Sequence, residues 1–278
     1  MAAFDAYLMT GGQPVTVMSW APGASPHKFL VQTLADPTSA LVASGAQILD
    51  SEFPEQAAAR KVLRAIGGRG ERAWSRVRDA AGLTQTSLER SLEILTDARV
   101  IAADEPVSTR RAPKEKRWRI ADPALRYWLA MVEPVLPDIY RRRPDIAFSW
   151  HEERYSAWRG RAIEPVVRDA LMRILPSDEW PDARHVGGWW PRSNNPEIDL
   201  VGVDTVPGNR VGLVGTIKWR RRGPVTTSEV TVAGTSALAV PGVMPSTPLV
   251  AVCPAGAVAD QRLTATWTAD DLLEAWPQ

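Results

Sequence analysis

Two short apolar segments near residue 200 constrain this chain more than any other feature. Residues 196–201 read Pro-Glu-Ile-Asp-Leu-Val, and residues 215–219 read Gly-Thr-Ile-Lys-Trp. An acidic residue opening one strand and a lysine closing the next are typical of a nuclease metal site, in which carboxylates hold a divalent cation and the lysine steadies the attacking water. Such sites place a second carboxylate two residues before the lysine, where this chain has Thr216. The pattern therefore predicts either a working nuclease or a nuclease-shaped binding module.

Composition indicates an ordinary globular chain. With 278 residues, an apolar share of 45% and a charged share of 23%, it has room for two domains. The apolar runs are too short to span a bilayer, and the N-terminus has no basic segment before an apolar core, so we expect a cytoplasmic protein with no membrane partner. The single cysteine, Cys253, lies in an apolar run and is expected to be buried in a strand.

A pattern of three helices and two strands is expected between residues 53 and 122. Apolar residues recur at helical spacing over 55–66, 73–81 and 84–99, with Gly82 ending the second helix and Thr84 able to cap the third. Residues 100–102 and 118–120 are short strand candidates joined by a basic loop. This order is typical of a winged helix-turn-helix.

In that fold the third helix enters the major groove and the wing contacts the backbone or the minor groove. The outward residues of the third helix would be Gln85, Thr86, Ser87, Glu89 and Arg90, and the basic wing residues are Arg110, Arg111, Lys114, Lys116 and Arg117. The net charge is only +1, but clustered charge can still bind phosphate. The alternative is a protein–protein or interdomain spacer, because Glu89 and Glu93 lower the local positive potential.

The second half is expected to be a small α/β layer structure. A helical linker with a proline-rich hinge at 137–144 precedes a long helix from about residue 150. Strand candidates follow at 186–190, 198–203, 211–217 and 249–253, with a helical or loop segment at about 227–239. The exposed candidates for base stacking are Trp189, Trp190 and Trp219.

The chain resembles the C-terminal part of the archaeal-type (DEXX-box) ATPases, whose tail is a winged helix followed by a DUF234-like domain with the PD-(D/E)XK nuclease fold. Residues 4–14 are similar to the lid segment after the ATPase core, and residues 118–128 to the junction after the wing. The resemblance implies a lid-like remnant at 1–52, a winged helix-turn-helix at 53–122, a helical linker at 123–148 and a restriction-endonuclease-like domain at 149–278. The expected fold class is thus α+β followed by α/β.

Two departures from that family shape the functional expectation. The chain has no G-x-x-x-x-G-K-[ST] segment, so ATP hydrolysis is not expected. By resemblance, Glu164 would be the helix carboxylate, Asp199 the principal metal ligand and Lys218 the catalytic lysine, but Thr216 replaces an acidic residue. A neutral hydroxyl is a poor Mg²⁺ ligand. Because residues two apart on a strand share a face, Glu197 could act beside Asp199 as a replacement metal ligand.

The sequence leaves three functions open. The first is a DNA-binding or regulatory protein that pairs a winged helix with a non-cleaving nuclease-like domain. The second is a DNA nuclease with Mg²⁺ or Mn²⁺ as its cofactor. The third is a protein–protein adaptor for a separate ATPase or another partner. Double-stranded DNA is the expected partner of the first two, and a homodimer is compatible with each of the three.

Overall fold

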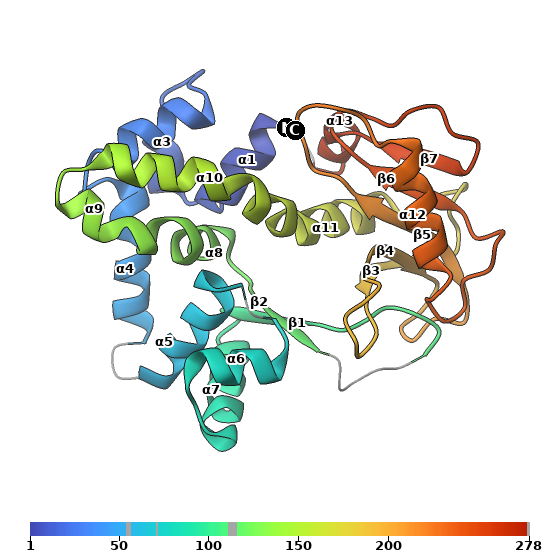
Figure 1. Cartoon of the computed structure of the whole chain (residues 1–278), viewed down its shortest axis with the longest axis horizontal. Coiled ribbons are helices and arrows are strands. Elements are labelled where there is room, and N and C mark those ends of the chain that lie inside the picture. The colour runs from blue at the N-terminus through green and yellow to red at the C-terminus, as the bar shows by residue number, and fades with distance from the viewer. Residues whose placement is uncertain (54–56, 71, 111–115, 277–278) are drawn as a thin grey trace. The chain divides into compact units, whose positions relative to one another are not determined.

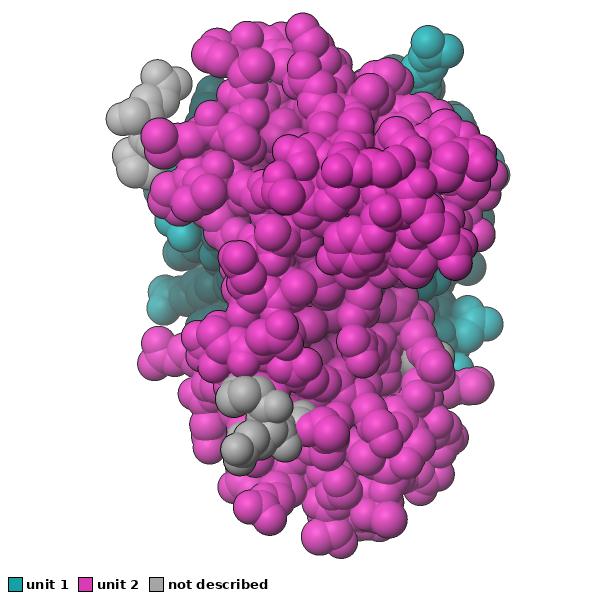
Figure 2. All heavy atoms as spheres, turned by 90° about the vertical axis from the view of Figure 1, so that its left-hand side faces the viewer, with its two compact units in different colours: residues 1, 105–116, 159–278 teal, residues 2–104, 117–158 magenta. Residues whose placement is uncertain are grey.

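The computed structural model describes residues 1–53, 57–70, 72–110 and 116–276. The chain divides into two compact units (Figures 1 and 2). Unit 1 comprises Met1, Glu105–Lys116 and Arg159–Gln278, and unit 2 comprises Ala2–Asp104 and Arg117–Trp158. Each unit is described by itself below. The fold is mixed, with helices in both units and a sheet in each.

Unit 2 begins with four short helices, of which the third and fourth start at serine caps. They are α1 (Ala2–Thr10), α2 (Pro14–Met18), α3 (Pro26–Leu34) and α4 (Ala40–Glu52). The side chain of Ser25 accepts a hydrogen bond from the backbone of α3, and Ser39 does the same for α4. Phe29, Leu34 and Leu49 from these helices are buried in the core of the unit. The expected short helices in residues 1–52 are therefore present.

The next elements match the predicted order of three helices and two strands. They are α5 (Ala57–Leu63), the π-helical turn η1 (Arg64–Gly68), α6 (Trp74–Ala81), α7 (Gln85–Asp97), β1 (Ile101–Asp104) and β2 (Arg117–Ile120). Gly82 ends α6 with φ of 62°, a left-handed conformation that glycine adopts without strain. Thr84 caps α7 by accepting a hydrogen bond from the Ser87 N–H, and Leu88, Leu92 and Leu95 bury one face of that helix. Strands β1 and β2 pair antiparallel.

The segment predicted to be a linker and hinge is part of the core of unit 2. It forms α8 (Pro123–Tyr127), η2 (Trp128–Val132), η3 (Glu133–Val135), α9 (Leu136–Tyr140) and the first part of α10 (Pro144–Ala162). Leu129 and Ile139 are fully buried, and the Trp128 indole N–H donates to the Val42 carbonyl at 2.8 Å. Because the segment contains many apolar side chains, it packs as helices in spite of its prolines. The division between the units falls at Arg159, within α10.

Unit 1 is built on a mixed sheet. Its elements are α11 (Glu164–Ile174), β3 (His185–Trp189), β4 (Ile198–Val203), β5 (Val211–Ile217), α12 (Thr227–Ala237), β6 (Leu249–Val252), β7 (Leu263–Trp267) and α13 (Ala269–Leu273). The strands lie in the order β3-β4-β5-β6-β7, antiparallel as far as β5 and parallel from β5 to β7. Helix α12 packs on β4 and β5, and α11 packs on β3 (Figure 1).

One hydrophobic cluster of unit 1 lies between the sheet and α12. It contains Val201, Val214, Val230 and Leu249, together with Cys253, which is buried as expected but lies just after β6. Strand β7 and helix α13 were not predicted from the sequence. Where the chain is described, no helix has the length and apolar character needed to cross a membrane.

Candidate functional site

Strands β4 and β5 bring the predicted site residues together. Leu200 pairs with Gly215 in this antiparallel register, which sets Asp199 beside Thr216 at the end of the ladder. Side chains at opposed positions of a sheet lie on the same face, close enough to touch. These residues form one wall of a pocket of about 240 Å³, and α12 forms the other. The lining residues include Glu197, Asp199, Thr216 and Lys218 from the strands and Ser228, Glu229 and Ser236 from the helix.

Asp199 is hydrogen-bonded within the protein. Its Oδ2 accepts from the Thr216 hydroxyl at 2.9 Å and from the Ile217 backbone N–H at 2.8 Å. Thr216 is itself buried. Thr216, which stands where a second carboxylate was expected, therefore donates to Asp199. One oxygen of Asp199 already accepts hydrogen bonds from two polar groups of the sheet.

Lys218 lies at the end of β5, as the sequence indicated. Its backbone N–H donates to the Val252 carbonyl at 2.8 Å, which fixes the end of β5 beside β6. The side chain is half-buried and lines the pocket. No ion pair is found between Lys218 and any carboxylate of the described chain. Asp199 and Lys218 therefore form no ion pair with each other in the described chain.

A second pocket carboxylate, Glu229, is also held internally. The Arg220 guanidinium donates to both oxygens of Glu229, at 2.8 and 2.7 Å. Glu229 also accepts from the Thr226 backbone N–H, completing the capping box at the start of α12. The hydrogen bonds from Arg220 are the main cause that lowers the pKa of Glu229 to about 2. This carboxylate was not among the predicted site residues, although the Thr-x-x-Glu capping pattern is readable in the sequence.

Glu164 is not one of the described residues that line the pocket. It begins α11 and pairs with Arg168 one turn later, at 3.2 Å. Arg168 in turn donates from Nε to the Asp199 backbone carbonyl at 3.0 Å. The helix carboxylate is therefore linked to β4 through Arg168, which was not among the predicted site residues. The signal that could have revealed it is the i, i+4 spacing of the glutamate and the arginine.

The pocket has few carboxylates for the metal site that was predicted. Throughout the part of the chain that the structure describes, no group of three or more His, Cys, Asp or Glu side chains could hold a metal ion. Glu197 is exposed just before β4, while Asp199 is half-buried and hydrogen-bonded to Thr216. A divalent cation prefers several carboxylate oxygens in near-octahedral geometry. The assignment of Asp199 and Glu197 as a metal-binding pair stays a prediction.

The predicted reading face of α7 is exposed but partly occupied. Gln85, Thr86 and Arg90 are exposed, and Ser87 is half-buried. The Gln85 side-chain amide donates to Glu89 at 2.9 Å, so a carboxylate of the same helix engages one of the candidate base-reading groups. This leaves Thr86 and Arg90 as the more available polar groups on this face.

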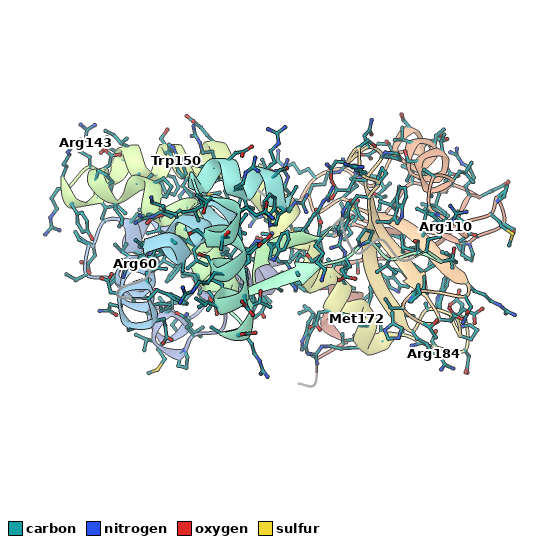
Figure 3. The ribbon with its side chains drawn as sticks, turned by 90° about the horizontal axis from the view of Figure 1, so that it is seen from below. Arg60, Arg110, Arg143, Trp150, Met172 and Arg184 are labelled. Carbon is teal, nitrogen blue, oxygen red and sulfur yellow. The ribbon has the colours of Figure 1, made fainter. Side chains whose placement is uncertain are left out.

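The described residues of the basic loop predicted to be a wing, 105–110 and Lys116, belong to unit 1, and Figure 3 labels Arg110. The Val107 N–H donates to the Gly188 carbonyl, the Gly208 N–H donates to the Ser108 carbonyl, and the Thr109 N–H donates to the Pro241 carbonyl. The segment before Arg110 thus lies against the sheet unit, because its backbone is hydrogen-bonded there.

The individual wing residues have different surroundings. Lys116 pairs with Glu105 at 2.9 Å, and Arg117 is buried in β2. Arg111 and Lys114 lie outside the described residues. Of the five predicted wing contacts, Arg110 is the exposed one in the part that can be described.

The tryptophans proposed for base stacking are not at the surface. Trp189, Trp190 and Trp219 have exposed fractions of 8%, 3% and 5%. They serve as packing residues of unit 1, because an apolar ring gains more from burial than from contact with water. The prediction that they are exposed is wrong.

Comparison with known proteins identifies one part of the chain. Residues 128–231 match the DUF234 family model, described as archaea bacterial proteins of unknown function. The matched segment runs from η2 through α11, β3, β4 and β5 into α12, and so includes Asp199, Thr216 and Lys218. The chain therefore contains a DUF234-like region. No curated protein and no solved structure matches it.

Proposed function

We propose that this protein binds duplex DNA through unit 2 and that unit 1 is a nuclease-like domain that does not cleave it. The observation that carries the second half of this proposal is the hydrogen bond between Thr216 Oγ1 and Asp199 Oδ2. In a cleaving site that position would supply a second metal-binding oxygen. Here Thr216 supplies a hydroxyl donor that is hydrogen-bonded to an oxygen of Asp199.

The order of elements in unit 1 supports the nuclease-like assignment. A helix, three antiparallel strands, a helix and a parallel strand follow one another as α11, β3-β4-β5, α12 and β6. This is the order that the resemblance to PD-(D/E)XK domains implies. Asp199 and Lys218 also line one pocket, as that fold requires.

The arrangement of unit 2 supports a DNA-binding role. Helices α5, α6 and α7 are followed by the β1–β2 pair, the order of a winged helix-turn-helix, and the polar residues at the start of α7 are exposed. Gln85, Thr86, Ser87 and Arg90 remain the proposed groove contacts. Because residues 105–116 belong to unit 1, the contacts of unit 2 are proposed to come from its helices.

Binding of the whole protein to duplex DNA as a function of salt tests the first half. Phosphate contacts predict a log–log slope of about −0.9 per contact, and a flat salt response would contradict the proposal. Cleavage assays with Mg²⁺ or Mn²⁺ test the second half. Cleavage that the Asp199→Ala variant abolishes would establish the metal-dependent nuclease instead.

Restoring the missing carboxylate sharpens the cleavage test. In the Thr216→Glu variant the hydroxyl donor is gone and an acidic group returns two residues before Lys218. Calorimetric titration with Mn²⁺ should give no binding heat with the native chain and a measurable heat with this variant. Equal heats for the two would show that Thr216 is not what limits metal binding.

A second candidate function, a protein–protein adaptor, is favoured by α2. This short helix buries Thr16, which is 2% exposed, and exposes Val15 and Met18 at 72% and 85%. Exposed apolar side chains on one short helix are typical of a contact surface. Loss of a co-purifying protein in the Met18→Asp variant, with retention in Lys28→Ala, would support this role.

A further inference from the structure

Charge is distributed unevenly over the three helices α5, α6 and α7. Residues 57–82 contain seven basic side chains and two acidic ones, Glu71 and Asp79. The basic residues are Arg60, Lys61, Arg64, Arg69, Arg72, Arg76 and Arg78. Residues 85–97, which form α7, contain one basic side chain and three acidic ones. The positive potential of this part of unit 2 is therefore concentrated before α7.

Several of these basic side chains already have acidic partners. Arg60 pairs with Asp50 at 2.7 Å, Arg64 with Glu133 at 2.9 Å, and Arg78 with Asp79 at 2.8 Å. Two arginines differ from them. Arg69 and Arg76 are exposed, and neither forms an ion pair with any residue in the described parts of the chain.

The Arg69 guanidinium contacts α6 close to Arg76. The Arg69 guanidinium donates from Nη1 to the Ala80 carbonyl at 3.0 Å. Ala80 lies about one helical turn beyond Arg76, so the Arg69 guanidinium is held close to Arg76 along α6. The adjacent turns are open, since a Cβ added at Gly70 or Gly82 would meet no atom within 4 Å. A linear phosphate backbone could therefore reach both guanidinium groups.

We propose that unit 2 holds duplex DNA mainly through phosphate contacts from Arg69 and Arg76, with little discrimination between sequences. This inference rests on the proposed DNA-binding function. A guanidinium presents a planar set of donors that matches two phosphate oxygens and keeps its charge at every physiological pH. Phosphate contacts carry no direct sequence information.

The charge of α7 supports the second part of the inference. Its exposed face presents Glu89 and Glu93, whose carboxylates repel a phosphate backbone. Gln85, the residue type that can read adenine, donates to Glu89 instead. The helix that would read bases is thus the acidic one, and the surface that attracts phosphate lies on the preceding helix.

The test measures fluorescence anisotropy of the full-length protein with two labelled duplexes of unrelated sequence over a salt series. The Arg69→Ala/Arg76→Ala variant should bind both duplexes about tenfold more weakly, and its log–log salt slope should be shallower by about 1.8. The matched control is Lys28→Ala/Arg141→Ala, which removes the same charge from exposed positions on α3 and after α9. Its affinity and slope should equal those of the native protein.

A second variant distinguishes a loss of DNA binding from a loss of protein stability. Arg69 donates to the end of α6, whereas the Arg76 side chain makes no hydrogen bond within the described chain. The single Arg76→Gln variant should therefore keep the native melting temperature and reduce the slope by about 0.9.

Each outcome has a separate meaning. If the native protein shows no salt-dependent binding, the proposed DNA-binding function fails. If the native protein binds DNA and both arginine variants bind as tightly as the native protein, the proposed function stands and this inference is wrong. A native preference of about a hundredfold or more for one duplex would overturn the lack of discrimination. Binding of poly-glutamate as tight as binding of DNA, lost in the double variant, would show a surface for acidic proteins and would also overturn it.

Discussion

The pocket of unit 1 and the arginine pair of unit 2 use their charges in opposite ways. In the pocket, Asp199 and Glu229 are hydrogen-bonded to Thr216 and Arg220. On α6 and the turn before it, Arg69 and Arg76 are exposed and form no ion pair in the described chain. The pocket resembles a catalytic site in its residue types, whereas the arginine surface resembles no motif. A charged group is available to a ligand only when the protein has not already satisfied it.

The two units also contain ionisable groups whose pKa values are shifted for different reasons. Unit 2 buries His151 between Tyr127 and Tyr155, with 2.9 Å between His151 Nε2 and the Tyr127 hydroxyl oxygen. Burial lowers the pKa of this histidine from 6.5 to about 4. Unit 1 instead keeps an ionised carboxylate, Glu229, through its arginine partner. The acid sensitivities of the two units are therefore separable.

The largest expected effect is acid destabilisation of unit 2 through His151. The folded pKa of about 4 lies below the ordinary value of 6.5, so the unfolded chain binds the proton more readily between these values. Stability should be complete above pH 6.5, and about 3 kcal/mol should be lost as the pH falls to about 4. Hydrogen exchange resolved by peptide would measure this loss in α10.

The same measurement separates the two units. The contribution of Glu229 is present above its unfolded pKa of 4.5 and is lost as the pH falls toward about 2. Unit 1 should therefore remain protected over the range in which unit 2 loosens. The His151→Gln variant, which keeps a polar group near Tyr127, should remove the loss in unit 2. An unchanged profile in that variant would assign the acid sensitivity to another group.

The next largest effect concerns the hydrogen bonding of Asp199. The Asp199→Ala variant leaves the Thr216 hydroxyl and the Ile217 N–H without their acceptor, which should cost about 2 kcal/mol in unfolding free energy of unit 1. Urea unfolding followed by hydrogen exchange in β4 and β5 would measure it. The control is Glu197→Ala, an exposed pocket carboxylate that should have little effect. Greater stability in Asp199→Ala would instead indicate a repulsive site built for a cation.

A smaller effect is expected at the start of α7. The Thr84→Ala variant removes the side-chain acceptor for the Ser87 N–H and should destabilise unit 2 by about 1 kcal/mol. The salt slope of DNA binding should stay the same, because Thr84 makes no phosphate contact in the proposed mode. Thr96→Ala, an exposed position near the end of α7, is the matched control. A change of the salt slope in the Thr84→Ala variant would indicate that α7 makes phosphate contacts.

The smallest effect is a gain of affinity. Replacing Glu93 by Gln removes a carboxylate from the exposed face of α7, which should strengthen DNA binding about twofold at low salt. Glu52→Gln, at the end of α4, provides a control with the same change of charge. Weaker binding in Glu93→Gln would show that this face does not lie near the phosphates.

Local signals in the sequence were sufficient for most of the helices and strands. Leucine spacing, Gly82 and Thr84 defined α6 and α7, and the apolar runs located β3, β4, β5 and β6. Strand β7 was not predicted because its residues, Leu-Thr-Ala-Thr-Trp, are half-buried or exposed and give no clear period. The cap at Thr268 and Asp271 that starts α13 was readable and was overlooked.

The sequence by itself determined which residues could meet at the end of β4 and β5, because strand alternation and antiparallel pairing are local rules. Only the tertiary structure decided what those residues do there. Asp199 and Thr216 are 17 positions apart, and their hydrogen bond exists because the register of the sheet sets them side by side.

The tertiary structure likewise decides which basic residues form ion pairs. Composition alone showed where arginines are frequent, but their ion-pair partners come from distant segments, as Glu133 does for Arg64. Which charges are neutralised, and which remain for a partner, depends on distances that the fold sets, since charge–charge energies fall steeply with separation in water.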